Sequence, residues 1–479
     1  MNKKSLSQFL SNQINRNSKV LQEYTQTNTG KPLAQRGKFD QLTKKIDQFL
    51  EDKKELRIVT MPGLRGVGKT TLLAQLYFTY QNSPADVFYF SVDQLIALDF
   101  SLQDCLQELE QILGQPLEEL DKKLVLLLDE VHYDPNWDLT LKTIADRYHK
   151  VMVIATGSSS VSLHENPDLA RRSDMSQLFP MNFTEYQSLA SKDKTNLEHN
   201  NLSKKIFQAS NANKCKQLIE NKLSEIKQYW INTDQLSVAN FLQLSTLPLS
   251  LNIPSKEKTR LQVEDLIDKV IEKDLAQLKN FDSTTLRKIK KILIMTADSY
   301  KVSYTSLAKN LENISKETII KIFNSLQEAE FLLKSAPLGS TYKKVRKQSR
   351  FHFMSPALRF TLLTTLHGDN TYQKFKGKLL EDIAALYLTK LIRRKTLTKP
   401  LMYDAASGGA DFVVNYNLDE QIVLEIGFNK SSTKQIKQTM DKIEEKAKFG
   451  ILVTNNKIDQ LRVENNILIL PLKIFLLLD

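Results

Sequence analysis

One short segment constrains this chain more than any other. A strand-like run, Arg57–Met61, leads directly into Gly63-Leu64-Arg65-Gly66-Val67-Gly68-Lys69-Thr70-Thr71, and a helical pattern follows over Leu72–Tyr80. Glycines at this spacing let the backbone bend tightly, so that several N–H groups point toward one place, and the start of the next helix adds positive potential there. The strand–loop–helix context therefore predicts a phosphate-binding loop at the carboxyl end of a β-strand.

The loop has the full G-x-x-x-x-G-K-[ST] spacing, so each residue type has an expected role. We expect Lys69 to reach the β- and γ-phosphates of ATP and the Thr70 hydroxyl to bind Mg²⁺. ATP and Mg²⁺ are the expected cofactors. The other nucleotide-binding residues that the motif predicts are Gly63, Leu64, Arg65, Gly66, Val67, Gly68 and Thr71.

A second, independent signal lies downstream. The apolar run Leu124–Leu128 ends in Asp129 and Glu130, which places two carboxylates at the carboxyl end of a buried strand. Ligands bind at that edge of an open α/β sheet. We expect Asp129 to hold the water shell of Mg²⁺ and Glu130 to orient and deprotonate the attacking water. The second acid favours hydrolysis over passive binding.

A third apolar run, Val151–Ala155, is followed by the polar segment Thr156-Gly157-Ser158-Ser159-Ser160. A polar residue at the end of a neighbouring strand would face the γ-phosphate or the attacking water. Thr156 or Ser158 is the candidate for this position.

Short apolar runs alternate with helical patterns over residues 50–185, which predicts an α/β domain of the P-loop type with a parallel sheet covered on both faces. Helical spacing then dominates, and strands and helices alternate again near the C-terminus. The predicted divisions are a loosely ordered or helical N-terminal arm (1–35), a P-loop core (36–186), a helical lid or connector (187–282), a helix-turn-helix segment (283–365) and a small α/β domain (366–479).

The composition of the chain limits the partners and the cellular compartment that we expect for it. Its formal net charge of +12 favours polyanionic partners, nucleic acid or an acidic membrane surface, without choosing between them. Only Cys105 and Cys215 are present, which argues against a disulfide framework and fits a reducing cytoplasm. No apolar signal core follows Met1–Gln8, and the apolar run Ile467–Leu478 is too short to span a bilayer. We therefore expect a cytoplasmic protein with no membrane segment.

The landmarks of the first half resemble those of prokaryotic AAA-type ATPases that carry a C-terminal restriction-endonuclease-like domain. They are Gly63–Thr71, Leu126–Val131 with Trp137, Thr156–Ser159, Leu169–Arg172 and Leu178–Tyr186. In that group an arginine precedes the Pro-x-x-Phe-x-Glu-[FY] element, and Arg172 falls at that place. The resemblance implies that Arg172 is a γ-phosphate sensor or an arginine finger, in its own subunit or in a neighbour, with Arg171 as a second candidate. The alternative is a surface arginine pair. His132 stands where the group more often has glutamine.

Two helical segments, Val302–Leu311 and Ser315–Phe331, precede an extended pair, Phe331–Ser335 and Arg350–Met354. This order resembles a winged helix-turn-helix. The stretch between Phe331 and Gly368 contains no acid and carries Lys334, Lys343, Lys344, Arg346, Lys347, Arg350 and Arg359. We expect contact with double-stranded DNA through Lys343, Lys344, Arg346 and Lys347, because basic side chains neutralise phosphates. The alternative is a module that only packs domains together.

The C-terminal segment resembles the core of restriction-endonuclease-like enzymes, whose pattern is Asp and then [DE]-x-Lys on the adjacent strand. The matching acids are Glu381, Asp411 and Glu425, which would hold a divalent metal. Gly427 stands in place of the lysine, and Lys430, Lys446 and Lys448 are alternative cations. Loss of the cation removes electrostatic help at the transition state, so we expect a degenerate nuclease site kept for structure or binding.

Three functions follow from these features. The first is an ATP-driven switch of AAA type that acts on or near DNA. The second is an ATP-gated, metal-dependent nuclease such as a defence effector. The third is an ATP-binding scaffold that meets a protein partner or a second copy of the chain.

Overall fold

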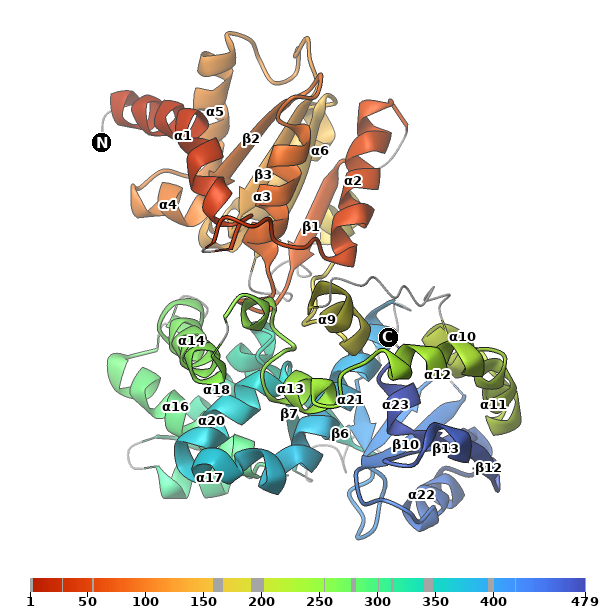
Figure 1. Cartoon of the computed structure of the whole chain (residues 1–479). Helices are drawn as coiled ribbons and strands as arrows, with labels where there is room; N and C mark the ends of the chain where they lie inside the picture. Colours follow the sequence, from red (N-terminus) through yellow and green to blue (C-terminus); the bar gives the residue numbers. More distant parts are fainter. Residues whose placement is uncertain are drawn as a thin grey trace. The chain divides into compact units, whose positions relative to one another are not determined.

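The computed structural model divides the chain into two compact units (Figure 1). The first consists of Met1–Phe179 with Glu328–Glu330, and the second of Pro180–Gln327 with Phe331–Asp479. The structure describes residues 3–27, 29–53, 56–157, 167–190, 202–253, 255–276, 281–299, 301–311, 314–339, 348–394, 400–417 and 419–478.

Within the described residues, the first unit contains a five-stranded parallel sheet in the order β2-β3-β4-β1-β5. The strands are β1 (Ile58–Pro62), β2 (Asp86–Ser91), β3 (Leu124–Asp129), β4 (Val151–Gly157) and β5 (Ser173–Met175). Strand β4 lies between β1, which leads into the phosphate-binding loop, and β3, which ends in the acidic pair. The predicted α/β fold with a parallel sheet is confirmed.

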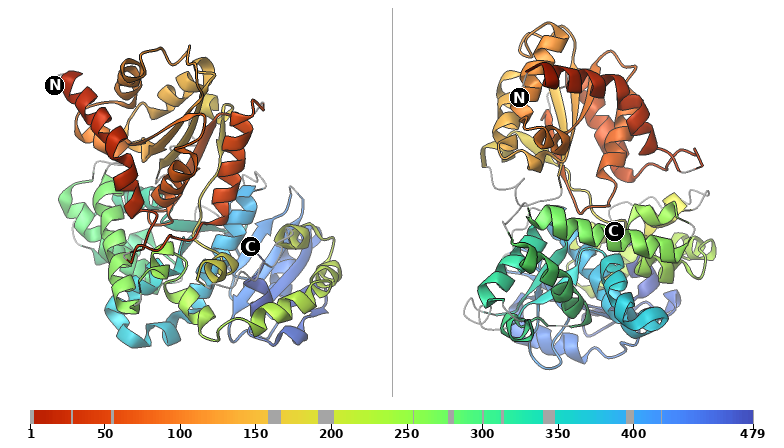
Figure 2. Two further views of the ribbon diagram at one scale, coloured as in Figure 1. Left: turned by 45° about the horizontal axis from the view of Figure 1, so that its top comes forward. Right: turned by 90° about the vertical axis from the view of Figure 1, so that its left-hand side faces the viewer.

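Both faces of this sheet are buried, as the continuous apolar runs require. On β3, Leu124, Leu126 and Leu128 belong to one core cluster, whereas the alternating Val125 and Leu127 are buried outside it. Figure 2 shows helices on both sides of the sheet. The helices are α1 (Lys3–Glu23), α2 (Gly37–Leu50), α3 (Lys69–Tyr80), α4 (Val92–Ala97), α5 (Leu102–Leu113), η1 (Val131–Tyr133), α6 (Trp137–Arg147) and α8 (Pro167–Ala170).

The predicted N-terminal arm is an ordered part of the first unit. Helix α1 packs against α3, α5 and β2. Its Leu10 and Leu21 side chains are fully buried, and the Asn17 side-chain amide donates a hydrogen bond of 3.1 Å to the Tyr89 carbonyl. The buried leucines explain why this polar segment does not remain loose.

The second unit combines many helices with a mixed sheet. Its helical elements are α9 (Phe183–Ala190), α10 (Leu202–Gln208), α11 (Ala212–Glu220), α12 (Leu223–Ile231), α13 (Ser237–Gln243), η2 (Pro248–Leu251), α14 (Lys256–Lys269), η3 (Val270–Leu275), α16 (Ser283–Asp298), α17 (Tyr304–Asn310), α18 (Lys316–Glu328), α20 (Pro356–His367), η4 (Gly368–Asn370), α21 (Thr371–Arg394), α22 (Lys434–Ile443), η5 (Glu444–Lys446), η6 (Ile458–Gln460) and α23 (Leu472–Phe475). Among the described residues, no helix has both the length and the apolar character needed to cross a membrane.

The sheet of the second unit has eight strands in its described parts, in the order β12-β13-β11-β10-β9-β8-β6-β7. They are β6 (Leu332–Pro337), β7 (Arg350–Phe353), β8 (Met402–Tyr403), β9 (Phe412–Asn415), β10 (Gln421–Gly427), β11 (Ala447–Thr454), β12 (Arg462–Glu464) and β13 (Ile467–Pro471). Strands β6 and β7 form the predicted extended pair, and β6 also pairs with β8. The expected division at residue 365 therefore separates elements that share one sheet.

The two predicted helices before this pair are present as α17 and α18. The Ser315 hydroxyl accepts a hydrogen bond of 3.1 Å from the Thr318 N–H, which is the expected N-cap. The apolar face of α18 is buried through Ile319, Ile322, Phe323 and Leu326, as the spacing predicted.

Candidate functional site

The phosphate-binding loop joins β1 to α3, and its glycines are needed for separate reasons. Gly66 and Gly68 have φ values of +85° and +94°, which L side chains rarely adopt. A Cβ atom on Gly63 would lie 2.3 Å from the Leu178 carbonyl oxygen, so only glycine fits there. Leu64 and Val67 are buried, Arg65 is partly exposed, and Thr71 lies in the first turn of α3.

Lys69 is the first residue of α3 and is 5% exposed. Its ammonium group donates a hydrogen bond of 2.9 Å to the Gly63 carbonyl. The ammonium therefore lies over the loop whose N–H groups are expected to bind phosphate, and a phosphate oxygen would compete with this carbonyl for it.

Asp129 is the centre of a hydrogen-bond network at the carboxyl edge of the sheet. The Thr70 hydroxyl donates to its Oδ2 at 2.6 Å, the Tyr89 hydroxyl donates to the same oxygen at 3.2 Å, and the Thr156 hydroxyl donates to its Oδ1. Burial and the charge of Glu130 raise the pKa of Asp129, while the hydrogen bonds from Thr156 and Thr70 oppose this shift. The fold thus brings together the residues that the sequence assigned to Mg²⁺.

The donor set at this point fits Mg²⁺. This ion prefers oxygen ligands and is usually held by one or two carboxylates together with waters and substrate phosphates. The Thr70 hydroxyl and the Asp129 carboxylate supply two such oxygens 2.6 Å apart, directly after the loop that would bind the phosphates.

Glu130 has an unusual backbone conformation, with φ of 54° and ψ of 45°. Its N–H donates a hydrogen bond of 3.1 Å to the Thr156 hydroxyl, and its carboxylate lies 3.3 Å from Nδ1 of His132. A Cβ atom on Gly157 would lie 3.2 Å from the same nitrogen, so Gly157 leaves room for the His132 ring. The backbone conformation of Glu130 and its contact with His132 together set the position and direction of the Glu130 carboxylate.

Thr156 contacts both acids. Its hydroxyl donates to Asp129 and accepts from the Glu130 N–H, so it holds the two acids relative to each other. Its predicted role toward the γ-phosphate or the attacking water stays a prediction. Ser158, the alternative candidate, lies outside the described residues, as do Ser159 and Ser160.

Arg172 lies at the opposite edge of the sheet from the loop. The next residue, Ser173, pairs with Ile58 at the amino end of β1, whereas the loop follows Pro62 at the carboxyl end. Four residues of strand separate the two ends by roughly 13 Å. Arg172 also forms an ion pair with Asp146 on α6. This separation does not favour Arg172 as a γ-phosphate sensor within its own subunit. Both of its predicted roles, γ-phosphate sensor and arginine finger, stay predictions.

Two residues beside the nucleotide site were not identified from sequence. Tyr89 contacts Asp129, and the Arg36 guanidinium donates to the Val67 carbonyl at 2.7 Å. His132, which the sequence comparison singled out as a departure from the group, contacts Glu130. Only Tyr89 carried a usable signal, because a tyrosine inside a buried strand needs a hydrogen-bond partner for its hydroxyl.

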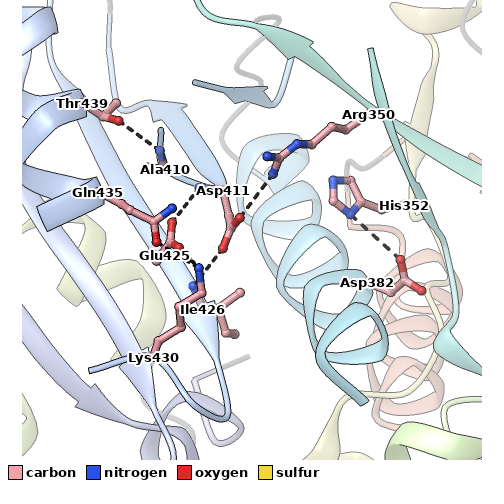
Figure 3. Close-up of polar contacts among 10 residues, drawn as sticks. All are labelled: Arg350, His352, Asp382, Ala410, Asp411, Glu425, Ile426, Lys430, Gln435 and Thr439. Carbon is pink, nitrogen blue, oxygen red and sulfur yellow. Dashed lines mark hydrogen bonds and ion pairs between the residues drawn. The ribbon is translucent and has the colours of Figure 1, made fainter. Parts of the chain in front are cut away.

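A second group of charged residues lies in the second unit (Figure 3). Asp411 directly precedes β9, and the fully buried Glu425 lies in β10. The Asp411 N–H donates to Glu425 Oε2 at 2.9 Å, and the Ile426 N–H donates to Asp411 Oδ2 at 3.3 Å. The strand pairing therefore places these two predicted acids side by side.

Lys430 supplies a cation beside these acids. Strand β10 ends at Gly427, and Lys430 reaches back to form an ion pair with Glu425 and a hydrogen bond of 3.1 Å to the Gln435 side chain. A Cβ atom on residue 427 would lie 2.7 Å from Lys430 Cγ, so the glycine makes room for this lysine. Lys448, another candidate, instead pairs with Glu420 at 3.2 Å.

Arg350 on β7 approaches the same acids from the opposite side in Figure 3. Its guanidinium lies 3.2 Å from Asp411 Oδ1 and 4.5 Å above the Tyr403 ring. Arg359 is buried and pairs with Asp382. Two of the basic residues counted toward DNA contact are thus used inside the fold. Lys343, Lys344, Arg346 and Lys347 lie outside the described residues.

The acids of this cluster are difficult to ionise together. Burial, followed by the charge of Asp411, raises the pKa of Glu381 to about 8 and that of Glu425 to about 7. Within the described residues, no group of three or more His, Cys, Asp or Glu side chains is arranged to hold a metal ion. Asp411 and Glu425 are thus held in ion pairs with Arg350 and Lys430, and Glu381 is a buried acid that the charge of Asp411 makes harder to ionise.

Comparisons with known proteins place this chain in a family. A family model described as an AAA domain matches residues 55–187, and a domain of unknown function (DUF8612) matches residues 245–367. The RuvB Holliday junction branch migration motor of Thermotoga maritima has a TM-score of 0.28 at 17% identity, covering 62% of this chain and 89% of that chain. PCH-2 of C. elegans has a TM-score of 0.26 at 11% identity, covering 65% and 72%.

A relative from Methanocaldococcus jannaschii matches over nearly the whole length. This uncharacterized protein, MJ1637, is 35% identical over 481 residues, which cover 99% of this chain and 94% of the relative. The chain therefore belongs to the same family as MJ1637, and its first unit contains an AAA-type P-loop ATPase domain.

Proposed function

We propose that the protein is a Mg²⁺-dependent switch of AAA type that binds and hydrolyses ATP and acts on or near DNA. One observation carries the proposal: the Thr70 hydroxyl at the start of α3 is hydrogen-bonded to Asp129 at the end of β3, at 2.6 Å. Lys69 precedes Thr70 and Glu130 follows Asp129, so the residue types needed for ATP hydrolysis meet at one edge of one sheet.

The residues would divide the work by chemistry. The loop N–H groups and the Lys69 ammonium bind and orient the phosphates, and bound Mg²⁺ would offset the charge of the phosphate oxygens. Glu130, whose side chain is 16% exposed, accepts the proton of the attacking water. Tyr89 and Thr156 keep Asp129 in place through their hydroxyl groups.

The first test is steady-state ATP hydrolysis with Mg²⁺, with and without duplex DNA. Lys69→Ala should abolish turnover, because it removes the cation that contacts the phosphates. Lys122→Ala is the matched control, since this lysine is exposed on the surface of the same unit. Wild-type turnover that persists in Lys69→Ala would contradict the proposed site.

The proposal of DNA as the partner is supported by the net charge of +12 and by the helix pair α17–α18 followed by a hairpin. The segment that joins β6 to β7 contains Lys343, Lys344, Arg346 and Lys347. Replacing all four with glutamine should weaken duplex binding and lower its salt dependence, because each phosphate contact releases counterions. ATP turnover indifferent to DNA would favour a protein partner or a second copy of the chain instead.

A second candidate function is metal-dependent cleavage of DNA gated by ATP. The contact of Lys430 with Glu425 favours it, because a cation stands beside the acids although the usual position is Gly427. Arg350 and Lys430 would have to release Asp411 and Glu425 before a metal could bind. If duplex DNA is cleaved with Mg²⁺ or Mn²⁺, Lys430→Met should abolish cleavage and leave ATP turnover intact. Cleavage that survives this change would place the activity elsewhere.

A further inference from the structure

Arg36 joins two parts of the first unit that are far apart in the sequence. It immediately precedes α2 and is 8% exposed. Its Nη1 donates to the Val67 carbonyl at 2.7 Å, and its Nη2 donates to the Phe179 carbonyl at 3.0 Å. One guanidinium thus bridges the phosphate-binding loop and the residue after which the chain enters the second unit.

The chain that leads to Phe179 runs along β1 toward the loop. The Ser176 N–H donates to the Thr60 carbonyl at 2.8 Å, and the Leu178 N–H donates to the Pro62 carbonyl at 2.9 Å. At Gly63 the approach is so close that an added Cβ atom would meet the Leu178 carbonyl. We call residues 176–179 the exit segment. Because of these contacts, a shift in the loop backbone would also displace the exit segment.

Helix α2 is attached to the same stretch of chain by other basic side chains. Lys38 donates to the Ser176 hydroxyl at 3.2 Å, and Lys45 forms an ion pair of 2.8 Å with Asp174. Arg36 adds the Val67 carbonyl to these contacts. The planar guanidinium of an arginine donates to two acceptors in a fixed relative geometry, whereas the single ammonium of a lysine holds two acceptors less rigidly.

We propose that Arg36 is a positioning residue that transmits the conformation of the phosphate-binding loop to the exit segment. Val67 lies two residues before Lys69, whose ammonium now bonds to the Gly63 carbonyl. Phosphate oxygens that attract Lys69 and the loop N–H groups would change the loop backbone, and Arg36 would pass this change to Phe179. The inference rests on ATP binding at the loop, as proposed above. Coupling arises because the ligand favours one of two arrangements.

Hydrogen exchange on the full chain, with and without Mg·ATP, tests this inference. In the wild type, Mg·ATP should slow exchange of the Ser176 and Leu178 amides about fivefold or more. Arg36→Met should lose this difference while still binding a fluorescent ATP analogue. Arg36→Lys keeps the charge and should retain part of the difference. Lys45→Met is the matched control, because it detaches α2 from Asp174 and leaves the Val67 contact in place, so it should behave as the wild type.

The outcomes separate the two proposals. Nucleotide-dependent protection that is unchanged in Arg36→Met would overturn the role of Arg36, and so would an equal loss in Lys45→Met. If Arg36→Lys retains part of the nucleotide-dependent protection, the result supports a role for the guanidinium geometry. A general loss of folding is distinguished from this, because it would alter exchange with and without nucleotide alike. Failure of the wild-type chain to bind Mg·ATP would overturn the proposed function itself, and this inference with it.

Discussion

The two acidic clusters of this molecule have the same ingredients in different arrangements. In the first unit, Asp129 receives hydrogen bonds from hydroxyl groups, and the nearby Lys69 bonds to a backbone carbonyl. In the second unit, Asp411 and Glu425 are paired directly with Arg350 and Lys430. Asp129 ends β3, Asp411 directly precedes β9 and Glu425 lies near the end of β10, so position along a strand alone does not distinguish the two clusters.

The two clusters differ in whether their carboxylates remain available to a cation. Neutral hydroxyl donors orient Asp129 without cancelling its charge, so a metal can take up that charge. Arginine and lysine cancel the charge of Asp411 and Glu425, and a metal would have to displace them from a buried site at considerable cost. We therefore propose the first cluster, and not the second, as the site of Mg²⁺ and nucleotide; in the second cluster Asp411 and Glu425 form ion pairs with Arg350 and Lys430.

The largest expected effect comes from exchanging one acid in each cluster. Asp129→Asn should lower ATP turnover roughly 100-fold or more, because it weakens the hold on Mg²⁺. Asp411→Asn should leave ATP turnover unchanged, because it lies in the other unit. Steady-state kinetics over a range of Mg²⁺ concentrations measures both. Equal losses of turnover in the two variants would contradict the assignment of the ATP site to the first cluster alone.

The next effect concerns the ion pairs of the second cluster. Arg350→Met leaves the buried Asp411 without this partner and should lower the free energy of unfolding by roughly 2–4 kcal/mol. The control is Arg462→Met, which removes an ion pair with Glu464 whose side chains are 46% and 45% exposed, and which should cost less than about 1 kcal/mol. Thermal unfolding of both variants measures the difference, and similar losses would argue against a buried network.

The pH dependence of stability should also distinguish the second cluster. Glu381 and Glu425 have folded pKa values of about 8 and about 7, above their usual 4.5. Between pH 4.5 and about 8 the folded state therefore binds more protons than the unfolded state. The contribution of these protonated acids to the free energy of unfolding is fully present near pH 4.5 and is lost as pH rises through 7 to 8. Glu425→Gln, which mimics the protonated acid, should flatten the fall of the melting temperature between pH 5 and 8. An unchanged slope would show that Glu425 is ionised in the fold.

The smallest effect should come from one hydroxyl group of the first cluster. Tyr89→Phe removes a hydrogen bond to Asp129 and should cost about 1 kcal/mol of stability, with a few-fold loss of turnover. Tyr80→Phe is the matched control, because Tyr80 donates to Asp47 on α2, away from the acidic pair. A loss of turnover in Tyr80→Phe as large as in Tyr89→Phe would remove Tyr89 from the site.

Local patterns predicted which residues meet at the carboxyl edge of the first sheet. The loop, Lys69, Thr70, Asp129 and Glu130 each follow from a strand and the residues that come directly after it, and parallel strands bring such ends to one edge. The contacts that were missed join distant segments. Arg36 and Val67 are 31 residues apart, and Arg350 and Asp411 are 61 apart, so no local spacing indicates them.

Register and strand length account for the other differences. Arg172 precedes the Pro-x-x-Phe-x-Glu-[FY] element as the resemblance implied, but the end of the sheet at which it lies is set by the pairing of Ser173 with Ile58. The hairpin β6–β7 joins the C-terminal sheet through β8, a strand of two residues that carries almost no sequence signal. Lys430 reaches Glu425 because β10 ends at Gly427, and strand ends are poorly determined by local sequence.

We propose that Glu130 activates water at the site formed by Lys69, Thr70 and Asp129. The most direct measurement is ATP hydrolysis by Glu130→Gln beside the wild type, with both saturated by Mg·ATP and with binding measured independently. We expect that binding is retained and that turnover falls about 100-fold or more, because the general base is lost. Unchanged turnover by a variant that still binds Mg·ATP would contradict this role of Glu130.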